Sequence, residues 1–189
     1  MTGREGNMKS DKKIFYIVDL IIAVLLIAAD QLTKLLAVGK LRGSEDYIVI
    51  DGVFRLHYLE NRGAAFSMLE DARVLFILVT AVMLVAVFYL LAKVPAGRHY
   101  LVWHISLTMI AAGGVGNLID RLRLSYVIDF LYFSLIDFPV FNVADVCVTV
   151  GVLLLVIWVV FVCKDEDLKF MESAGRRQKK KEETGQKDV

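Results

Sequence analysis

The sequence predicts a membrane protein of the all-α class: a four-helix transmembrane bundle with a small β-sheet or hairpin outside the membrane. Of its 189 residues 57% are hydrophobic, and they gather in long blocks instead of recurring at the intervals of a soluble core. About 20 apolar residues cross roughly 30 Å of hydrocarbon as a helix. A soluble chain this short could hardly bury four such helices. The four blocks that we expect to span the membrane are residues 14–38, 74–92, 100–118 and 143–163.

The first block carries Asp19, Asp30 and Lys34. Its basic lead resembles that of a secretory signal. The apolar stretch is too long for one, however, and continues into Asp30-Gln-Leu-Thr-Lys34 instead of a small-residue cleavage site. We therefore expect a retained anchor. The second block has no charge, the third contains the run Gly113-Gly-Val-Gly116, and the fourth has Asp145 as its single charge.

The distribution of Lys and Arg predicts the orientation, because cytoplasmic flanks carry an excess of both. The N-terminal flank, the connection 93–99 and the segment after Cys163 are the basic ones. Both termini should therefore lie in the cytoplasm, with the segments 39–73 and 119–142 on the extracytoplasmic side. We expect one membrane domain over residues 1–163. Residues 164–189 should form a disordered basic tail that can touch anionic membrane lipid.

The first outside segment has the pattern of a β-hairpin. Two runs rich in β-branched and aromatic residues, 46–50 and 53–58, are separated by Asp51-Gly52, a strong hairpin signal. Apolar and polar residues alternate along the second run, so a small sheet on the membrane surface is expected. The string Asn61-Arg-Gly63-Ala-Ala-Phe-Ser67 follows. It is either a plain turn into a short interfacial helix or, because its residues are small, a place of close backbone approach.

Asp129 and Asp145 are the candidate catalytic residues. Both fall at the same edge of the predicted bundle, where a carboxylate is costly and therefore suggests function. If the two approach each other they cannot both ionise comfortably, so they would share a proton. One could then activate water while the other donates a proton. The alternative is two unrelated interfacial acids.

Polar residues at the outer end of the third block lie near this edge. Asn117, Asp120 and Arg121 share a helix face, because separations of three and four residues stack. They either shape a site or form an interfacial ion pair that anchors the helix. Gly113, Gly116 and Asp120 have helical spacing, which predicts a face that neighbouring helices approach closely.

Two other functions are compatible with acids in a membrane. A transporter or assembly subunit using the carboxylates as a proton relay would place them at mid-bilayer, often with repeat symmetry. A presenilin-like protease would carry Gly-x-Gly-Asp, whereas here Gly114-Val-Gly116 is followed by Asn117. The scattered histidines suggest no metal and no cofactor, and Cys147 and Cys163 lie too far apart on one helix for a disulfide. The net charge of +1 gives no sign of nucleic-acid binding.

Five strings in order resemble the lipoprotein signal peptidase (signal peptidase II) family, over nearly the whole stretch 14–163. They are Asp30-Gln-Leu-Thr-Lys34, Asn61-Arg-Gly-Ala-Ala-Phe-Ser67, Gly113-Gly-Val-Gly-Asn117-Leu-Ile-Asp120-Arg121, Val127-Ile-Asp129-Phe130 and Phe141-Asn142-Val-Ala-Asp145. One such string is weak evidence, but five on a matching topology are strong. Val146 departs from the small polar residue common in the family after the second aspartate.

The resemblance implies a function and a site. Asp129 and Asp145 match the catalytic pair of a membrane aspartyl endopeptidase of the bacterial inner membrane. The substrate would be a prolipoprotein whose cysteine already carries diacylglycerol, cut on the amino side of that cysteine. A globomycin-type inhibitor and a monomeric enzyme are also expected. The residues that match positions supporting the pair or binding substrate are Asn61, Gly63, Asn117, Asp120, Arg121, Asn142, Asp30 and Lys34.

Overall fold

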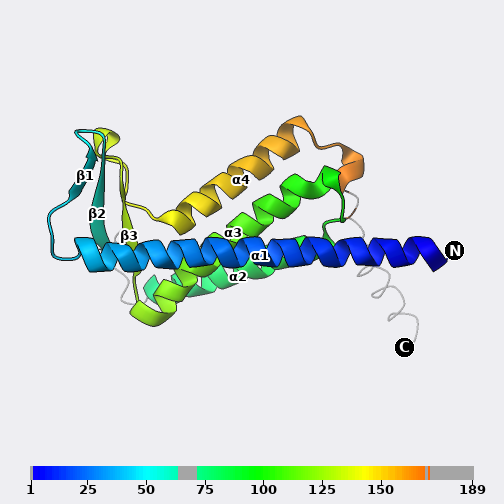
Figure 1. Ribbon diagram of the computed structural model, residues 1–189, viewed down its shortest axis with the longest axis horizontal. Coiled ribbons are helices and arrows are strands. Elements are labelled where there is room, and N and C mark those ends of the chain that lie inside the picture. The colour runs from blue at the N-terminus through cyan, green and yellow to red at the C-terminus, as the bar shows by residue number, and fades with distance from the viewer. Residues whose placement is uncertain (1, 64–71, 169, 171–189) are drawn as a thin grey trace, which may run out of the picture.

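The computed structural model describes residues 2–63, 72–168 and 170. Four long helices run beside one another, and a small sheet lies at the end where α1 finishes (Figure 1). The helices are α1 (Thr2–Leu41), α2 (Ala72–Lys93), α3 (Leu101–Leu124) and α4 (Val143–Phe161). The strands are β1 (Tyr47–Ile50), β2 (Phe54–Asn61) and β3 (Val127–Tyr132). The predicted class is confirmed.

All four predicted spans are helices long and apolar enough to cross a membrane. The spans are Lys12–Leu41, Val74–Lys93, Arg98–Leu124 and Val143–Phe161. Buried residues make up 67% of the most apolar window of the third span, against 11%, 11% and 22% in the other three. Helix α3 is therefore the centre of the bundle, and α1, α2 and α4 pack around it. Their remaining apolar faces are left for lipid.

Glycines allow the close packing around α3. A Cβ added at Gly113 would collide with the carbonyl oxygen of Ala144 on α4, and one at Gly116 would lie 2.6 Å from Oδ2 of Asp30 on α1. Two neighbouring helices therefore approach α3 on the face without bulk, as the spacing of small residues predicts.

Helix α3 continues six residues beyond the predicted end of the third span, so the first residues of the predicted outside segment 119–142 are helical. The helix runs to Leu124 and is closed by Ser125, whose φ of 71° is left-handed. Arg121 and Arg123 lie in the last turn, where positive charge is favourable beside the unpaired carbonyl groups. Asp120 and Arg121 therefore project from a rigid helix.

The sheet is antiparallel with the order β1-β2-β3. The predicted hairpin is confirmed: Gly52 has a φ of 67°, and the N–H of Val53 donates to the carbonyl of Ile50 at 3.0 Å. The third strand was not predicted. Residues 127–130 are all buried, so β3 lacks the alternation that marked β2. It pairs with β2 and places Asp129 opposite Leu59.

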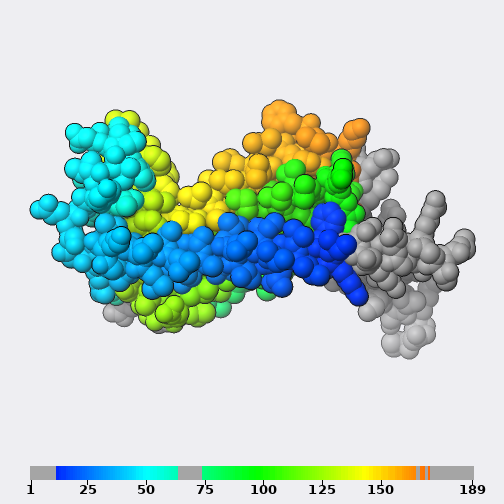
Figure 2. Space-filling model, viewed as in Figure 1, coloured from blue at the N-terminus to red at the C-terminus, as the bar shows by residue number. Residues whose placement is uncertain are grey.

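An apolar cluster attaches the sheet to the bundle. Ala37 and Leu41 of α1 pack with Phe130 of β3, and Leu56 and Tyr58 of β2 lie against them. The other side of the sheet faces the first turns of α4 across a hollow, which is visible in the space-filling view (Figure 2).

The opposite end of the bundle is closed by aromatic rings. Trp103 packs edge-on against Trp158 and against Phe170, with centroids 5.8 Å and 5.5 Å away. The first residues of the predicted tail thus pack on the bundle, because Asp165–Leu168 form a 3-10 turn and Asp167 accepts from His99. The rest of that predicted tail lies outside the described residues. Cys147 and Cys163 are not joined by a disulfide.

Candidate active site

Asp129 lies on β3 with 1% of its surface exposed. Nδ2 of Asn61 donates to its Oδ2 at 2.8 Å, and Nδ2 of Asn142 donates to its Oδ1 at 2.6 Å. Burial raises the pKa of Asp129 to about 6, and the nearby charge of Asp145 acts in the same direction. The two hydrogen bonds oppose this rise, since they favour the carboxylate. Asp129 can therefore hold a proton far more readily than an ordinary aspartate.

Asp145 is positioned by the start of α4. Asn142 is the N-cap residue, and its Oδ1 accepts from the N–H of Asp145 at 3.0 Å. In return the N–H of Asn142 donates to Oδ2 of Asp145 at 3.2 Å, which completes a capping box. Nδ2 of Asn117 holds the other oxygen, Oδ1, at 2.8 Å. The same local motif that begins the helix thus fixes the carboxylate.

Two asparagine side chains connect the aspartates. Nδ2 of Asn142 donates both to Asp129 and, at 3.1 Å, to Oδ1 of Asn117. Asn117 in turn donates to Asp145. The structure therefore brings Asp129 and Asp145 to one place, with Asn142 in contact with both. This arrangement favours a shared site over two unrelated interfacial acids.

A buried cation lies behind the asparagines. Nζ of Lys34 contacts Asp30 Oδ2 at 2.9 Å, Asp120 Oδ2 at 2.8 Å and Asn117 Oδ1 at 2.9 Å. These three acceptors match the three N–H groups of the ammonium. Nε2 of Gln31 also lies within 3.1 Å of both carboxylates. Asp120 is 3% exposed and pairs with Lys34, which favours a residue that shapes the site over an interfacial ion pair with Arg121 that anchors the helix.

The two carboxylates around Lys34 also bind the elements that carry the aspartate pair. Oδ1 of Asp30 accepts from the N–H of Ala144 in the first turn of α4 at 2.9 Å. Oδ2 of Asp120 accepts from the N–H of Ile128 on β3 at 3.2 Å. Each carboxylate therefore fixes the backbone next to one member of the pair.

Arg121 and Gly63 meet at one ring. The guanidinium of Arg121 lies 5.1 Å from the centre of the Phe76 ring on α2, within electrostatic reach of both aspartates. Gly63, two residues after the end of β2, approaches the same ring. Its φ is 80°, and an added Cβ would collide with the ring of Phe76. Its N–H donates to Oδ1 of Asn61 at 2.9 Å. The close approach predicted for the glycine is present. Residues 64–67 of that string lie outside the described residues.

Gln31 and Phe76 were not singled out from the sequence. Gln31 could have been noticed, because an amide inside a membrane span needs partners as much as a charge does. Phe76 carried no signal, since an aromatic residue in an apolar block is ordinary. The three histidines bond to aspartates elsewhere: His57 to Asp46, His99 to Asp167 and His104 to Asp19.

Four apolar spans and a bridged pair of aspartates, one of them buried with a raised pKa, define a membrane-embedded hydrolase of the aspartic type. A family model described as signal peptidase (SPase) II matches residues 22–161. The chain belongs to the signal peptidase II family and is an aspartic peptidase. The family and the peptidase activity expected from the five strings are confirmed, and the proton-relay subunit is not supported.

Similar proteins and solved structures agree with this family assignment. Lipoprotein signal peptidases of Streptococcus pyogenes serotype M5 (strain Manfredo) and serotype M18 (strain MGAS8232) are each 43% identical over 157 residues, which is 82% of this chain and 97% of theirs. A bacterial membrane enzyme solved in meso at 1.9 Å resolution is 28% identical with a TM-score of 0.68, covering 77% of this chain and 94% of that one. A second, at 2.3 Å, is 28% identical with a TM-score of 0.65, covering 76% and 87%.

Proposed function

We propose that Asp129 and Asp145 are the catalytic pair with which this signal peptidase removes the signal peptide of a prolipoprotein. The observation that supports this best is the position of Asn142, which contacts both carboxylates. The side-chain Nδ2 of Asn142 holds Asp129 and its backbone N–H holds Asp145, so the two acids lie close together, and the charge of Asp145 contributes to the raised pKa of Asp129. Asp129 therefore keeps its proton to a higher pH than an ordinary aspartate does.

The chemistry follows from the unequal surroundings of the two acids. Asp145 is half-buried and acts as the base that takes a proton from water. The water oxygen attacks the carbonyl carbon of the scissile peptide bond. Asp129, which holds the shared proton, donates it to the carbonyl oxygen. When the tetrahedral intermediate collapses, one of its hydroxyl groups returns a proton to Asp129, the C–N bond breaks, and the proton on Asp145 passes to the leaving amine.

The surrounding polar residues orient this pair. Asn61, Asn117 and Asn142 fix three of the four carboxylate oxygens through their side chains, so each acid presents a defined geometry to water. Arg121 lies beside both acids and binds the substrate backbone or the developing oxyanion. The buried salt bridges of Lys34 with Asp30 and Asp120 stabilise the elements that carry the pair.

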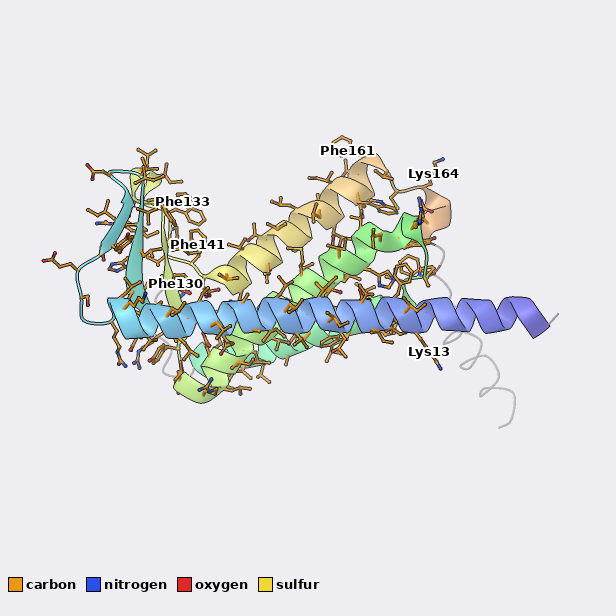
Figure 3. All side chains as sticks on the ribbon, in the orientation of Figure 1. Lys13, Phe130, Phe133, Phe141, Phe161 and Lys164 are labelled. Carbon is orange, nitrogen blue, oxygen red and sulfur yellow. The ribbon has the colours of Figure 1, made fainter. Side chains whose placement is uncertain are left out.

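The substrate carries diacylglycerol on the cysteine that follows the scissile bond, and cleavage occurs on the amino side of that cysteine. Acyl chains in the bilayer hold such a cysteine near the ends of the spans. Both aspartates lie at that depth, Asp145 in the first turn of α4 and Asp129 on the adjoining strand. Phe133 and Phe141, stacked with centroids 5.8 Å apart, lie on the side of the sheet that faces α4 (Figure 3). They give the hollow between sheet and helix an apolar wall for a lipidated segment.

We place the catalytic pair on the extracytoplasmic face of the bacterial inner membrane, with both termini in the cytoplasm. The N-terminal flank and the connection 93–99, both basic, support this orientation, since both lie at the end opposite the sheet (Figure 1). The enzyme works as a monomer in contact with membrane lipid. A globomycin-type inhibitor competes with the prolipoprotein for the same hollow.

The test is cleavage of a synthetic diacylglyceryl prolipoprotein by purified variants. Asp129→Asn and Asp145→Asn should each abolish cleavage while the protein still purifies as a folded species. Asp137→Asn is the matched control, because among the described contacts the side chain of Asp137 bonds only to the nearby Tyr132 hydroxyl. Full activity in either of the first two variants would remove that residue from the pair. Equal cleavage of an unlipidated precursor would contradict the role of diacylglycerol.

A further inference from the structure

A small cleft opens between the outer ends of α1 and α3, on the surface that these helices present to lipid. Its volume is about 170 Å³. Leu35 on α1 is 62% exposed and Leu124 on α3 is 36% exposed, so apolar side chains flank it on both helices. The cleft is lined by Gln31, Lys34, Leu35, Val38, Arg42, Asp120, Arg123, Leu124, Tyr126 and Ile128.

Positive charge gathers at the outer rim of this cleft. Arg42 comes one residue after α1 ends, and Arg123 lies in the last turn of α3, so both stand at the level of lipid headgroups. Arg123 is exposed and forms no ion pair with any residue that the structure describes. Arg42 is 58% exposed and contacts Glu60, which is also engaged by Arg62. A net positive charge therefore remains.

The floor of the cleft adds no free negative charge. Asp120 is the single carboxylate among the lining residues, and it is buried and bonded to Lys34, Gln31 and the N–H of Ile128. A ligand that carried an ammonium group would find no carboxylate free to receive it. A ligand with a phosphate and no ammonium fits the two arginines, because guanidinium groups bind phosphate oxygens with matched geometry.

We propose that this cleft binds the headgroup of an anionic glycerophospholipid of the leaflet on the sheet side. The phosphate lies between Arg42 and Arg123. The acyl chains run along the exposed faces of Leu35 and Leu124 toward the middle of the bilayer. This site is separate from the hollow between the sheet and α4, since none of Asp129, Asn142 and Asp145 lines the cleft.

Native mass spectrometry of the full-length protein, titrated with phosphatidylglycerol or with phosphatidylethanolamine, tests the site. Phosphatidylglycerol should bind at least tenfold more tightly. An arginine near a membrane surface contributes roughly 1 kcal/mol toward anionic lipid, which is about fivefold in affinity. Arg123→Gln should therefore weaken phosphatidylglycerol binding about fivefold, and Arg42→Gln with Arg123→Gln about 30-fold.

Lys40→Gln is the matched control. Lys40 is exposed at the same end of α1 but does not line the cleft. Its replacement by Gln removes one positive charge, as Arg123→Gln does. It should leave the affinity within about twofold, and Arg123→Lys should keep most of it. An equal loss in Lys40→Gln, or equal binding of the two lipids, would overturn the proposal. Displacement of the lipid by millimolar inorganic phosphate would show that the cleft takes free phosphate instead. Cleavage of prolipoprotein by Arg123→Gln checks that the variant is folded.

Discussion

The side-chain amide of Asn142 lies 2.6 Å from Oδ1 of Asp129, on a strand thirteen residues earlier in the chain. The same residue caps α4 and exchanges two hydrogen bonds with Asp145. Asn142 therefore has two separable structural roles. One is to begin a helix, which several polar residues can do, and the other is to hold Asp129, which requires an amide of this length.

Asn142→Ala and Asn142→Ser separate these roles. Alanine removes the cap and should destabilise the protein by about 1 kcal/mol or more, whereas serine is a good N-cap and should restore most of that loss. Neither side chain reaches Asp129, so both variants should lose about 100-fold or more in kcat/KM. Thermal unfolding in detergent and cleavage of the lipidated precursor measure the two effects. Activity that returned together with stability in the serine variant would mean that capping is the only role.

The pH dependence of cleavage should report the proton on Asp129. Its pKa is raised to about 6 from the ordinary 3.8, and the proposed mechanism needs this acid protonated. Activity should therefore fall as pH rises above the pKa of Asp129. Asn61→Ala removes a hydrogen bond that lowers the pKa of Asp129, so the pKa should rise further and the alkaline limb should move to higher pH. Profiles of kcat/KM against pH check the sign, and a shift to lower pH would contradict the assignment.

Lys34→Met should destabilise the protein more than any surface substitution. It leaves Asp30 and Asp120 buried without their cation, and breaking a buried pair in this way costs about 3–5 kcal/mol. Adding Asp120→Asn to Lys34→Met removes one of the two unpaired charges and should recover part of the loss. Unfolding temperatures of the single and double variants measure the coupling. Simple additivity of the two changes would argue against direct pairing.

Long apolar blocks and Asp51-Gly52 were sufficient to predict the spans and the hairpin, because both signals are local. The end of α3 was missed since hydropathy falls after residue 118 while the residues that follow still favour a helix. Strand β3 was missed for a different reason. It is buried on both faces and pairs with a strand about 70 residues away, so no local alternation marks it.

The site residues were visible in the sequence as polar groups at one membrane edge, but their partners were not. Spacing along α3 could place Asn117 and Asp120 on one face, yet it could not show that Lys34 from α1 joins them. Nor could it show that Asn142 spans the gap between β3 and α4. Those contacts join elements that are distant in sequence, and a single sequence does not show which distant elements lie close together in space.

Gly63→Ala should impair cleavage through the position of Asn61. A side chain at this φ of 80° is strained, and its Cβ would collide with the ring of Phe76. The turn must then shift, and with it the amide that holds Asp129, so we expect a loss in kcat of about tenfold or more. A double variant that adds Phe76→Leu makes room for the Cβ but leaves the backbone strain, so activity should recover only in part.

Gly39→Ala is the matched control, because its Cβ meets nothing within 4 Å and its position is helical. That variant should keep full activity and gain about 1 kcal/mol of helix stability. Unimpaired cleavage by Gly63→Ala would show that the turn adjusts without moving Asn61.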